Sequence, residues 1–246
     1  MCGRMTQQRD PSEVAQIFDA EINAADETAL RELGPRYNVA PTQPLTVVVQ
    51  RDDGRRVELH RWGLVPAWSG SPTARSPLIN ARAETIAGSP SFRTSFIRRR
   101  CIVPADGFYE WLRDGKRRQP FLIRPTATAV GPQTLAFAGI WSPWRDPETG
   151  DWLLTAAVVT SAANATVARL HDRMPVVLGQ DEWPLWLDPT ITDAGLLGDL
   201  LQPAPGDLLE VVPVSTRVNN ANNEGADLIE QIALETPADP PLTLFG

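Results

Sequence analysis

Nine short runs rich in β-branched and aromatic residues follow one another along this chain of 246 residues. They cover residues 45–50, 56–62, 100–105, 107–113, 120–124, 135–141, 152–161, 175–178 and 208–215. Many are bounded by Gly, Pro or Asp-Gly, and short strands separated by such turn residues favour antiparallel hairpins. The pair 107–113 and 120–124, for example, predicts a hairpin with Asp114-Gly115 at its tip. The sequence therefore predicts a sheet that is mainly antiparallel.

Helical periodicity is confined to short segments beside these runs. Val14, Ile17 and Phe18 recur at helical spacing, which predicts a helix with Ser12 as its N-cap and Glu13 in its first turn. Further helices are expected at residues 89–97, 163–170, 180–187 and 192–202. These elements predict an α+β fold: a single compact domain with a curved, barrel-like, mainly antiparallel β core and peripheral helices. We expect the domain to span residues 2–232, and residues 233–246 to form a flexible tail.

Composition narrows the class of protein further. Hydrophobic residues make up 42% and charged residues 22% of the chain, which is ordinary for a globular protein. No apolar run approaches the roughly 18–20 residues of a membrane span, and the polar start does not read as a signal peptide. Only two cysteines, Cys2 and Cys101, argue against a disulfide framework and fit a reducing compartment. With two histidines, His60 and His171, they are also a poor basis for a zinc site.

Charge is distributed unevenly along the chain. Residues 1–125 contain 19 Lys and Arg against 14 Asp and Glu, whereas residues 126–246 contain 4 against 16. Almost all the basic residues are arginines, which suit bidentate phosphate contacts better than lysines do. The pattern fits a basic surface for nucleic acid, and it fits equally an acidic soluble protein whose charges are spread unevenly.

The first five residues, MCGRM, place Cys2 next to the initiator methionine. If Met1 is removed, Cys2 offers an α-amine, whose pKa is about 7.7–8.0, and a thiol on adjacent carbons. The amine can form an imine with an aldehyde, and the thiol can close onto the imine carbon to give a five-membered thiazolidine. Two other interpretations stay open: an N-terminal nucleophile of the amidohydrolase type, and a small side chain that packs under the sheet.

Two segments contain polar side chains in apolar surroundings. In residues 77–85, Asn80 is suited to position a sugar or carbonyl oxygen and Arg82 to bind a phosphate. The alternative is a helix N-terminus with Asn80 as its cap. In residues 107–113, Glu110 is either exposed to solvent or buried with a raised pKa, and the second case would tune it for general acid–base catalysis.

Histidine and tryptophan add two further candidates. His171 lies between a predicted helix and a predicted strand, where functional side chains often collect, whereas His60 lies in an alternating strand and is expected to be structural. Trp68 lies in a loop rich in Pro and Gly and could stack on an unpaired base. The basic clusters 98–100 and 116–118 could contact phosphates, although solvated turn charge explains the second cluster better.

Several motifs occur together and in order from residue 2 to about residue 230. They are MCGR, RYNVAPTQ, RWGLVPAW, PLINARAET, CIVPADGFYEW, QPFLI, LTAAVVTSAAN and HDRMPVVL. This series resembles the SRAP family, the SOS response-associated peptidase domain. The resemblance implies an α+β domain over residues 2–232 with a cleft for single-stranded DNA. It also implies that the N-terminal cysteine, exposed by removal of Met1, forms a thiazolidine crosslink with abasic sites.

The resemblance assigns site residues one by one. It implies that Asn80, Glu110 and His171 surround Cys2 as catalytic residues. The residues implied to contact DNA are Arg4, Trp68, Arg82, Trp111 and Arg173. Two features depart from the family pattern: Ser69 follows Trp68 where a second aromatic residue is common, and the C-terminal half is acidic.

We therefore expect a sensor or repair factor that captures abasic sites in single-stranded DNA, with a self-reacting, lyase-like crosslinking activity. His171 would assist opening of the sugar ring, Glu110 would relay protons, and Asn80 would hold a sugar oxygen or the N-terminus. The expected protein is a cytoplasmic monomer that joins the nucleoid when bound to DNA and uses no metal, cofactor or membrane. The alternatives are a cysteine peptidase that acts on its own N-terminus or on other peptides, and a non-covalent single-strand binder.

Overall fold

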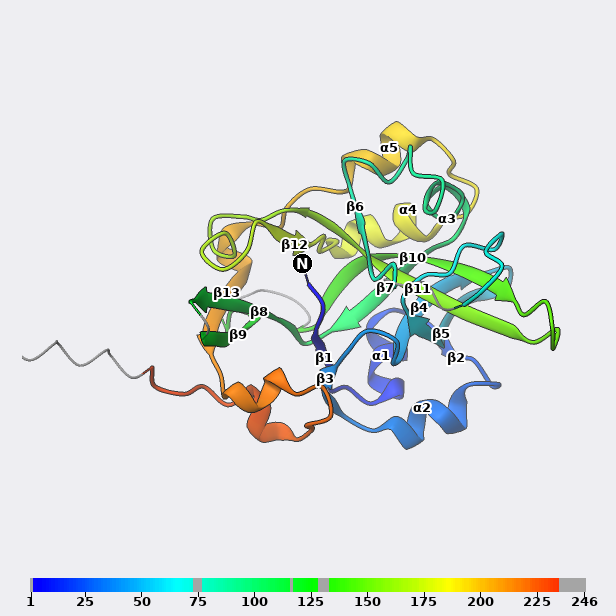
Figure 1. Cartoon of the computed structure of the whole chain (residues 1–246). Helices are drawn as coiled ribbons and strands as arrows, with labels where there is room; N and C mark the ends of the chain where they lie inside the picture. Colours follow the sequence, from blue (N-terminus) through cyan, green and yellow to red (C-terminus); the bar gives the residue numbers. More distant parts are fainter. Residues whose placement is uncertain (1, 73–76, 116, 128–132, 235–246) are drawn as a thin grey trace, which may run out of the picture.

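Eight of the nine predicted strand runs coincide with strands of the computed structural model, which describes residues 2–72, 77–115, 117–127 and 133–234 (Figure 1). Its strands are β1 (Met5–Gln7), β2 (Glu21–Ile22), β3 (Arg36–Val39), β4 (Pro44–Arg51), β5 (Gly54–Trp62), β6 (Asn80–Arg82), β7 (Arg100–Ala105), β8 (Gly107–Asp114), β9 (Arg117–Pro125), β10 (Leu135–Arg145), β11 (Trp152–Ala162), β12 (Arg173–Pro175) and β13 (Leu209–Pro213). Its α-helices are α1 (Pro11–Ile17), α2 (Glu27–Leu33), α3 (Arg93–Arg98), α4 (Trp183–Leu187) and α5 (Ala194–Asp199). Short 3₁₀ helices are η1 (Gln180–Glu182), η2 (Gly206–Leu208), η3 (Thr216–Asn219) and η4 (Ala226–Ile229). No helix of the described part is long and apolar enough to cross a membrane.

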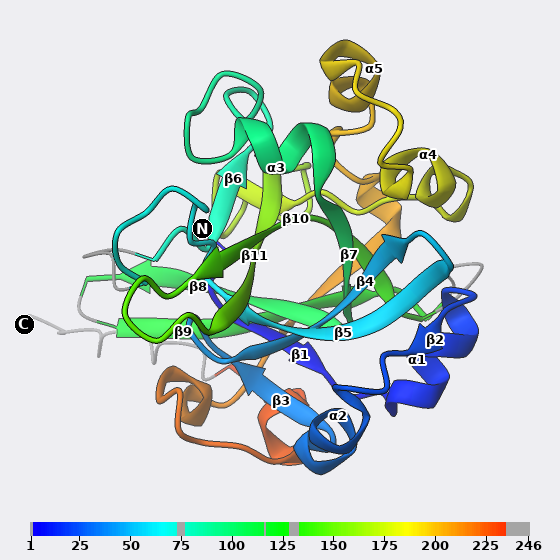
Figure 2. The ribbon, with the colours of Figure 1, turned by 90° about the vertical axis from the view of Figure 1, so that its right-hand side faces the viewer.

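Five strands close into a barrel, which confirms the predicted barrel-like core. Strands β11, β10, β7, β4 and β5 pair in that order, and β5 pairs with β11 again (Figure 2). The other four pairings of the barrel are antiparallel, whereas the closing contact is parallel and joins Thr155 to Arg61 and Ala156 to Trp62. Closure leaves these five strands with few free edges.

Both faces of the barrel strands are apolar because each face is covered. Residues such as Val103, Phe137 and Val158 fill the interior, while their neighbours along the strands pack against the outer helices through Phe96 and Trp186. This explains why β7, β10 and β11 read as largely continuous apolar runs, whereas β5 alternates. The interior is tight: a Cβ atom at position 139, where the chain has glycine, would lie 2.7 Å from the Sγ atom of Cys101.

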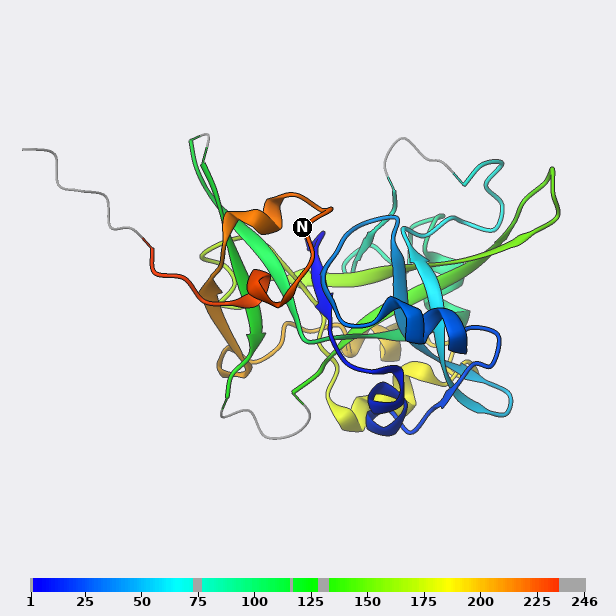
Figure 3. The same cartoon turned by 90° about the horizontal axis from the view of Figure 1, so that it is seen from below.

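A second sheet, in the order β13-β9-β8-β1-β3, packs beside the barrel. The side chain of Gln7 fastens β1 to the barrel, because its Nε2 donates to the carbonyls of Thr46 (2.9 Å) and Pro104 (2.7 Å). Its Oε1 accepts from the Thr46 amide at 3.0 Å. The C-terminal segment with η3 and η4 lies over this sheet, where Val218 and Leu228 pack on Tyr109 (Figure 3).

His60 is structural, as predicted from its alternating strand. It is buried, and its Nε2 atom lies 3.0 Å from the Oε2 atom of Glu58. Arg51 pairs with the same carboxylate through its Nε and Nη2 atoms at 2.8 and 2.6 Å. The Arg51 guanidinium and the His60 ring together compensate the buried charge of the Glu58 carboxylate, which would otherwise be destabilising.

Some predictions of local structure are wrong. Residues 163–170 form turns and no regular helix: Asn164 Oδ1 accepts from the Val167 amide (3.0 Å) as an N-cap does, but only isolated helical hydrogen bonds follow, from the Ala168 amide to the Asn164 carbonyl and from the His171 amide to the Val167 carbonyl. The N-cap of α1 is Asp10 rather than Ser12, since Asp10 Oδ1 accepts from the Ser12 amide at 2.8 Å. Of the run 175–178, only Pro175 belongs to a strand. Residues 235–246, most of the predicted tail, and Lys116 of the basic cluster 116–118 lie outside the described residues.

Candidate active site at the N-terminus

Cys2 is buried immediately before β1, where three segments that are distant in sequence meet. Asn80 Nδ2 donates a hydrogen bond to the main-chain carbonyl of Cys2 at 2.8 Å. Asn80 lies in β6, which pairs in parallel with β11, so the barrel sets the position of this amide. On the other side, the Tyr109 amide of β8 donates to the carbonyl of Arg4 at 3.0 Å. In Figure 1 the start of the described chain lies between β6 and β8.

A polar pocket of about 350 Å³ opens beside this N-terminus. Its lining residues are Gly3, Arg4, Glu110, Trp111, Arg113, Arg118, His171 and Asn219. The pocket therefore brings together four residues predicted from the sequence, next to Cys2. Arg118, also in the lining, belongs to the predicted basic cluster 116–118, whereas Arg113 and Asn219 were not predicted.

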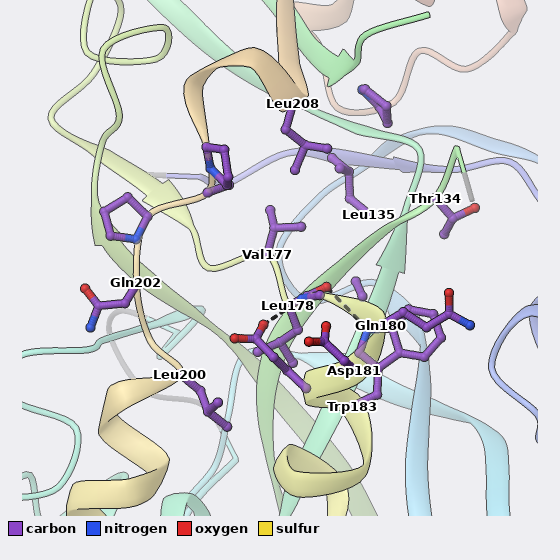
Figure 4. A pocket seen from close by; sticks show the side chains of 17 residues that line it. Thr134, Leu135, Val177, Leu178, Gln180, Asp181, Trp183, Leu200, Gln202 and Leu208 are labelled. Carbon is purple, nitrogen blue, oxygen red and sulfur yellow. Dashed lines mark hydrogen bonds between the residues drawn. The ribbon is translucent and has the colours of Figure 1, made fainter. Parts of the chain in front are cut away.

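A larger pocket of about 530 Å³ lies elsewhere, between the segment around Leu200 and Leu208 and the start of η1 (Figure 4). Leu135, Val177 and Trp183 contribute to its wall, and none of its described lining residues is a cysteine or a histidine. Size alone therefore does not identify the reactive site, whereas the chemistry around Cys2 does.

Glu110 is the buried carboxyl group of the site. Its side chain is only 3% exposed, and burial raises its pKa above the ordinary value. Burial also raises the pKa of the Cys2 thiol, and the nearby charge of Glu110 acts in the same direction. The thiol is therefore protonated at neutral pH, and any reaction at sulfur needs a base to take its proton.

His171 lies in the loop before β12, on the other side of the pocket. Its Nδ1 atom accepts from the Arg173 amide at 3.0 Å and lies 2.8 Å from Asp172 Oδ1. The amide contact fits a neutral ring with its proton on Nε2, while the carboxylate contact fits a protonated ring. Partial burial lowers the pKa of His171. We therefore assign the neutral Nε2–H tautomer at pH 7.

Arg4 and Trp111 form one wall of the pocket. Arg4 Nη1 donates to Asn38 Oδ1 (2.6 Å) and to the Val218 carbonyl (2.7 Å), and its guanidinium lies 5.8 Å from the centre of the Trp111 ring. The indole nitrogen of Trp111 donates to Asn219 Oδ1 at 2.6 Å. Both side chains are therefore held in place within the described structure.

The remaining predicted DNA contacts are spread over the surface. Arg173, whose side chain is 11% exposed, forms a bidentate ion pair with Glu84 at 2.5 and 2.9 Å, while Arg82 on β6 is exposed. Trp68 is 69% exposed and lines a separate pocket of about 360 Å³ with Arg99, outside the Cys2 pocket. Its exposure fits the prediction of a stacking surface but does not test it.

No cluster of three or more His, Cys, Asp or Glu side chains suited to a metal ion occurs within the described ranges. The sequence patterns missed Arg113, and they included Arg118 only as part of the basic cluster 116–118 in the predicted hairpin. The available signal was the register of that hairpin: Asp114 pairs with Arg117, which places Arg113 opposite Arg118.

The fold and the site define a class: a single α+β unit around a closed barrel, with a cysteine at the N-terminus beside a carboxyl group and an imidazole. The chain belongs to the family described as SOS response associated peptidase (SRAP), whose model matches residues 1–221.

Comparison with characterised relatives agrees with this membership. The chain is 37% identical over 231 residues to the abasic site processing protein YoqW of Bacillus subtilis (strain 168), covering 94% of this chain and 99% of the relative. It is 32% identical over 238 residues to the abasic site processing protein YedK of Escherichia coli (strain K12), covering 94% and 100%. Identity to the abasic site processing protein HMCES of Xenopus tropicalis is 30%, covering 85% and 70%.

Solved structures show the same fold. A protein from Bacteroides thetaiotaomicron superposes with a TM-score of 0.83 at 24% identity, covering 94% of this chain and all of that one. A phage-related protein from Bordetella bronchiseptica gives a TM-score of 0.66 at 29% identity, covering 87% and 94%.

Proposed function

We propose that this protein recognises abasic sites in single-stranded DNA and captures them covalently through Cys2 after removal of Met1. The observation that carries the proposal is the placement of Cys2, held by Asn80 beside a pocket that contains Glu110 and His171. The names of the relatives support abasic-site processing as the biological role. The aminothiol chemistry, the single-stranded substrate and the residue roles below are our own proposal.

The first step exposes an aldehyde. The sugar of an abasic site is mainly a closed hemiacetal, and its opening needs a proton removed from the C1′ hydroxyl and a proton supplied to the ring oxygen. His171 assists this transfer, since its neutral ring offers an Nε2–H donor beside the pocket. The product is a free C1′ aldehyde next to the N-terminus.

Covalent capture then proceeds through two bonds to C1′. The Cys2 amine adds to the aldehyde, and loss of water gives an imine. The thiol sulfur next adds to the same carbon while its proton is transferred away, and the imine nitrogen gains a proton to complete the thiazolidine. The balance is one aldehyde and one aminothiol giving one thiazolidine and one water. The ring closure is intramolecular, which favours it strongly.

Glu110 relays protons in both stages. A carboxyl group whose pKa is raised by burial can protonate the departing hydroxyl and later accept the thiol proton. This second role matters because the buried thiol is itself protonated at neutral pH. The same group can return the proton to sulfur, so the crosslink is expected to reverse slowly.

DNA backbone contacts are assigned to the arginines around the site, Arg4, Arg82 and Arg173, and base stacking to Trp68 and Trp111. A single strand suits the site because no partner strand has to be displaced. Guanidinium groups bind phosphates in a bidentate manner, and aromatic faces tolerate any base, so these contacts position DNA without reading its sequence.

The family description also names a peptidase, and the alternative is that Cys2 cleaves peptides. The raised pKa of its thiol does not favour a thiolate nucleophile. A third candidate is non-covalent binding in which Cys2 takes no part.

The test is a denaturing gel of the protein incubated with single-stranded DNA that contains one abasic site. Intact DNA, Cys2→Ala and the matched variant Cys101→Ala, which removes the other buried cysteine, are run in parallel. We expect a shifted band that requires the abasic site and Cys2 but not Cys101. Absence of the band from protein whose mass confirms loss of Met1 would contradict covalent capture.

A further inference from the structure

Two arginines lie directly opposite one another near the end of the β8–β9 hairpin. Arg113 of β8 is paired with Arg118 of β9, so both side chains project from the same face of the hairpin. Residues in this relationship have Cβ atoms about 4.5–5.5 Å apart, and like charges placed there destabilise the hairpin. The like-charge pair therefore destabilises the fold, and a negatively charged ligand would offset this destabilisation.

The described protein offers these charges no acidic partner. No carboxylate among the described side chains lies within ion-pair distance of Arg113 or Arg118, whereas Arg124, further along β9, pairs with Glu210 at 2.6 Å. Both side chains are exposed at the hairpin. The hairpin could have placed a Glu opposite an Arg, as cross-strand pairs often do, but it places two positive charges together.

Both arginines line the Cys2 pocket. They share its wall with Glu110, Trp111 and His171. Burial raises the pKa of Glu110 and lowers that of His171; the positive charge of Arg113 is close enough to oppose the first shift and to add to the second. The positive charge is thus at the reactive centre and not on a remote surface.

Asn219 fixes the backbone that presents the pair. Its Oδ1 accepts from the indole nitrogen of Trp111 at 2.6 Å, and its Nδ2 donates to the Arg118 carbonyl at 3.3 Å. These two bonds set the orientation of the amide and tie both hairpin strands to η3. The backbone that carries the two guanidinium groups is therefore held in place by η3, unlike a hairpin end without tertiary contacts.

We propose that Arg113 and Arg118 together bind one backbone phosphate adjacent to the abasic nucleotide and so hold C1′ beside Cys2. Two guanidinium groups supply several N–H donors for the oxygens of one phosphodiester, and the phosphate neutralises their mutual repulsion. The inference rests on the function proposed above, and it adds a phosphate site that the family motifs in this sequence do not contain.

The experiment measures non-covalent binding of the whole protein to a single-stranded oligonucleotide with one tetrahydrofuran residue. This analogue keeps the abasic sugar ring but cannot open to an aldehyde. In a series of oligonucleotides, each linkage within two nucleotides of the analogue is replaced in turn by a neutral methylphosphonate. Each is titrated with wild type, with R113Q/R118Q and with the control R31Q/R145Q, which also removes two exposed arginines but lies outside the pocket.

We expect R113Q/R118Q to bind the unmodified oligonucleotide about tenfold more weakly. One neutral linkage should weaken the binding of wild type and of the control R31Q/R145Q to a similar extent. The same linkage should leave the affinity of R113Q/R118Q unchanged. The slope of log K against log salt concentration should also be shallower by about 0.7 for R113Q/R118Q than for wild type, because one phosphate contact is lost. If every neutral linkage weakens wild type and R113Q/R118Q equally, the proposed phosphate site is wrong.

Two further readouts keep the result interpretable. Thermal unfolding should show R113Q/R118Q to be at least as stable as wild type, because the substitution removes a like-charge pair. If the double variant unfolds, it would be replaced by R118Q alone. For R118Q the same loss of sensitivity to the neutral linkage is expected. On DNA with a true abasic site at saturating concentration, wild type and the control R31Q/R145Q should form the crosslink. Failure of wild type to form this crosslink would refute the proposed function, whatever the binding measurements on R113Q/R118Q show.

Discussion

The side-chain amide of Asn80 donates to the main-chain carbonyl of Cys2 over 2.8 Å. The Oδ1 atom of the same amide is buried and has no hydrogen-bond partner among the described residues. A buried acceptor without a donor is costly, so this oxygen is suited to receive an N–H or O–H that the reaction brings to the site. The freed amine of Cys2 and a sugar hydroxyl are the two candidates.

We predict that Asn80→Ala slows crosslinking about tenfold, because one positioning hydrogen bond is lost. The rate constant at saturating abasic DNA, measured by rapid quenching, should fall while thermal stability changes little. Asn222→Ala, at an exposed position, serves as the control and should react like wild type. An unchanged rate for Asn80→Ala would remove its role in holding the N-terminus.

Replacing Glu110 separates its catalytic role from its effect on stability. Glu110→Gln should slow capture and reversal by about 10²-fold, since a general acid–base group is lost. The folded-state pKa is raised, so the native state binds this proton more tightly than the unfolded state. Wild type should therefore lose stability as the pH rises through that range, and Glu110→Gln should not.

The measurement is the melting temperature of both proteins between pH 4 and pH 8. The two curves should meet at low pH, and the variant should be the more stable protein at high pH. A variant that melts lower than wild type at pH 8 would show that the carboxylate stabilises the fold, contrary to this assignment. Glu13→Gln, on the exposed side of α1, controls for loss of a carboxylate.

His171 should give the capture reaction an inflection below the ordinary imidazole pKa, because partial burial lowers its pKa. Above the inflection the ring is neutral, and below it the ring is charged. Asp172 lies 2.8 Å from Nδ1 and favours the charged form, so Asp172→Asn should move the inflection to lower pH. His171→Gln should abolish it. A shift to higher pH in Asp172→Asn would contradict the assignment.

Arg173 is available to DNA only if it leaves Glu84, since the two groups form a bidentate pair at 2.5 and 2.9 Å. Glu84→Gln should therefore strengthen binding to single-stranded DNA by a few-fold, and the gain should shrink at high salt. Fluorescence anisotropy with an intact oligonucleotide tests this directly. Equal affinities for Glu84→Gln and wild type at low salt would indicate that Arg173 does not exchange its partner for phosphate.

Local sequence patterns predict the hairpins well because turn residues and strand runs are neighbours. Asp114-Gly115 therefore located the β8–β9 hairpin, although Asp114 ends β8 and pairs with Arg117 instead of lying at the tip. The same patterns could not show that β5 closes on β11, because that contact joins Arg61 and Trp62 to residues more than ninety positions later. They also missed α2 and the short strands β1–β3, which are too brief to show a period.

The site residues were chosen from family motifs, and the structure places Asn80, Glu110 and His171 around the Cys2 region. The residue types alone do not show that these residues are functional, because each of them also has an ordinary structural explanation. The decisive information is spatial: β6, β8 and the loop before β12 converge on the first residues. The Arg113–Arg118 pair escaped notice because its meaning depends on strand register rather than on either residue alone.

The burial of Cys2 has a consequence for how the protein is made. The partners that enclose this residue, in β6, β8 and the loop at His171, are synthesised long after the N-terminus has left the ribosome. An aminopeptidase has to reach the Met1–Cys2 bond, and the burial of Cys2 restricts access to that bond once the domain has folded. Trimming of Met1 is therefore expected to be co-translational, and the aminothiol would be completed before the fold that uses it exists.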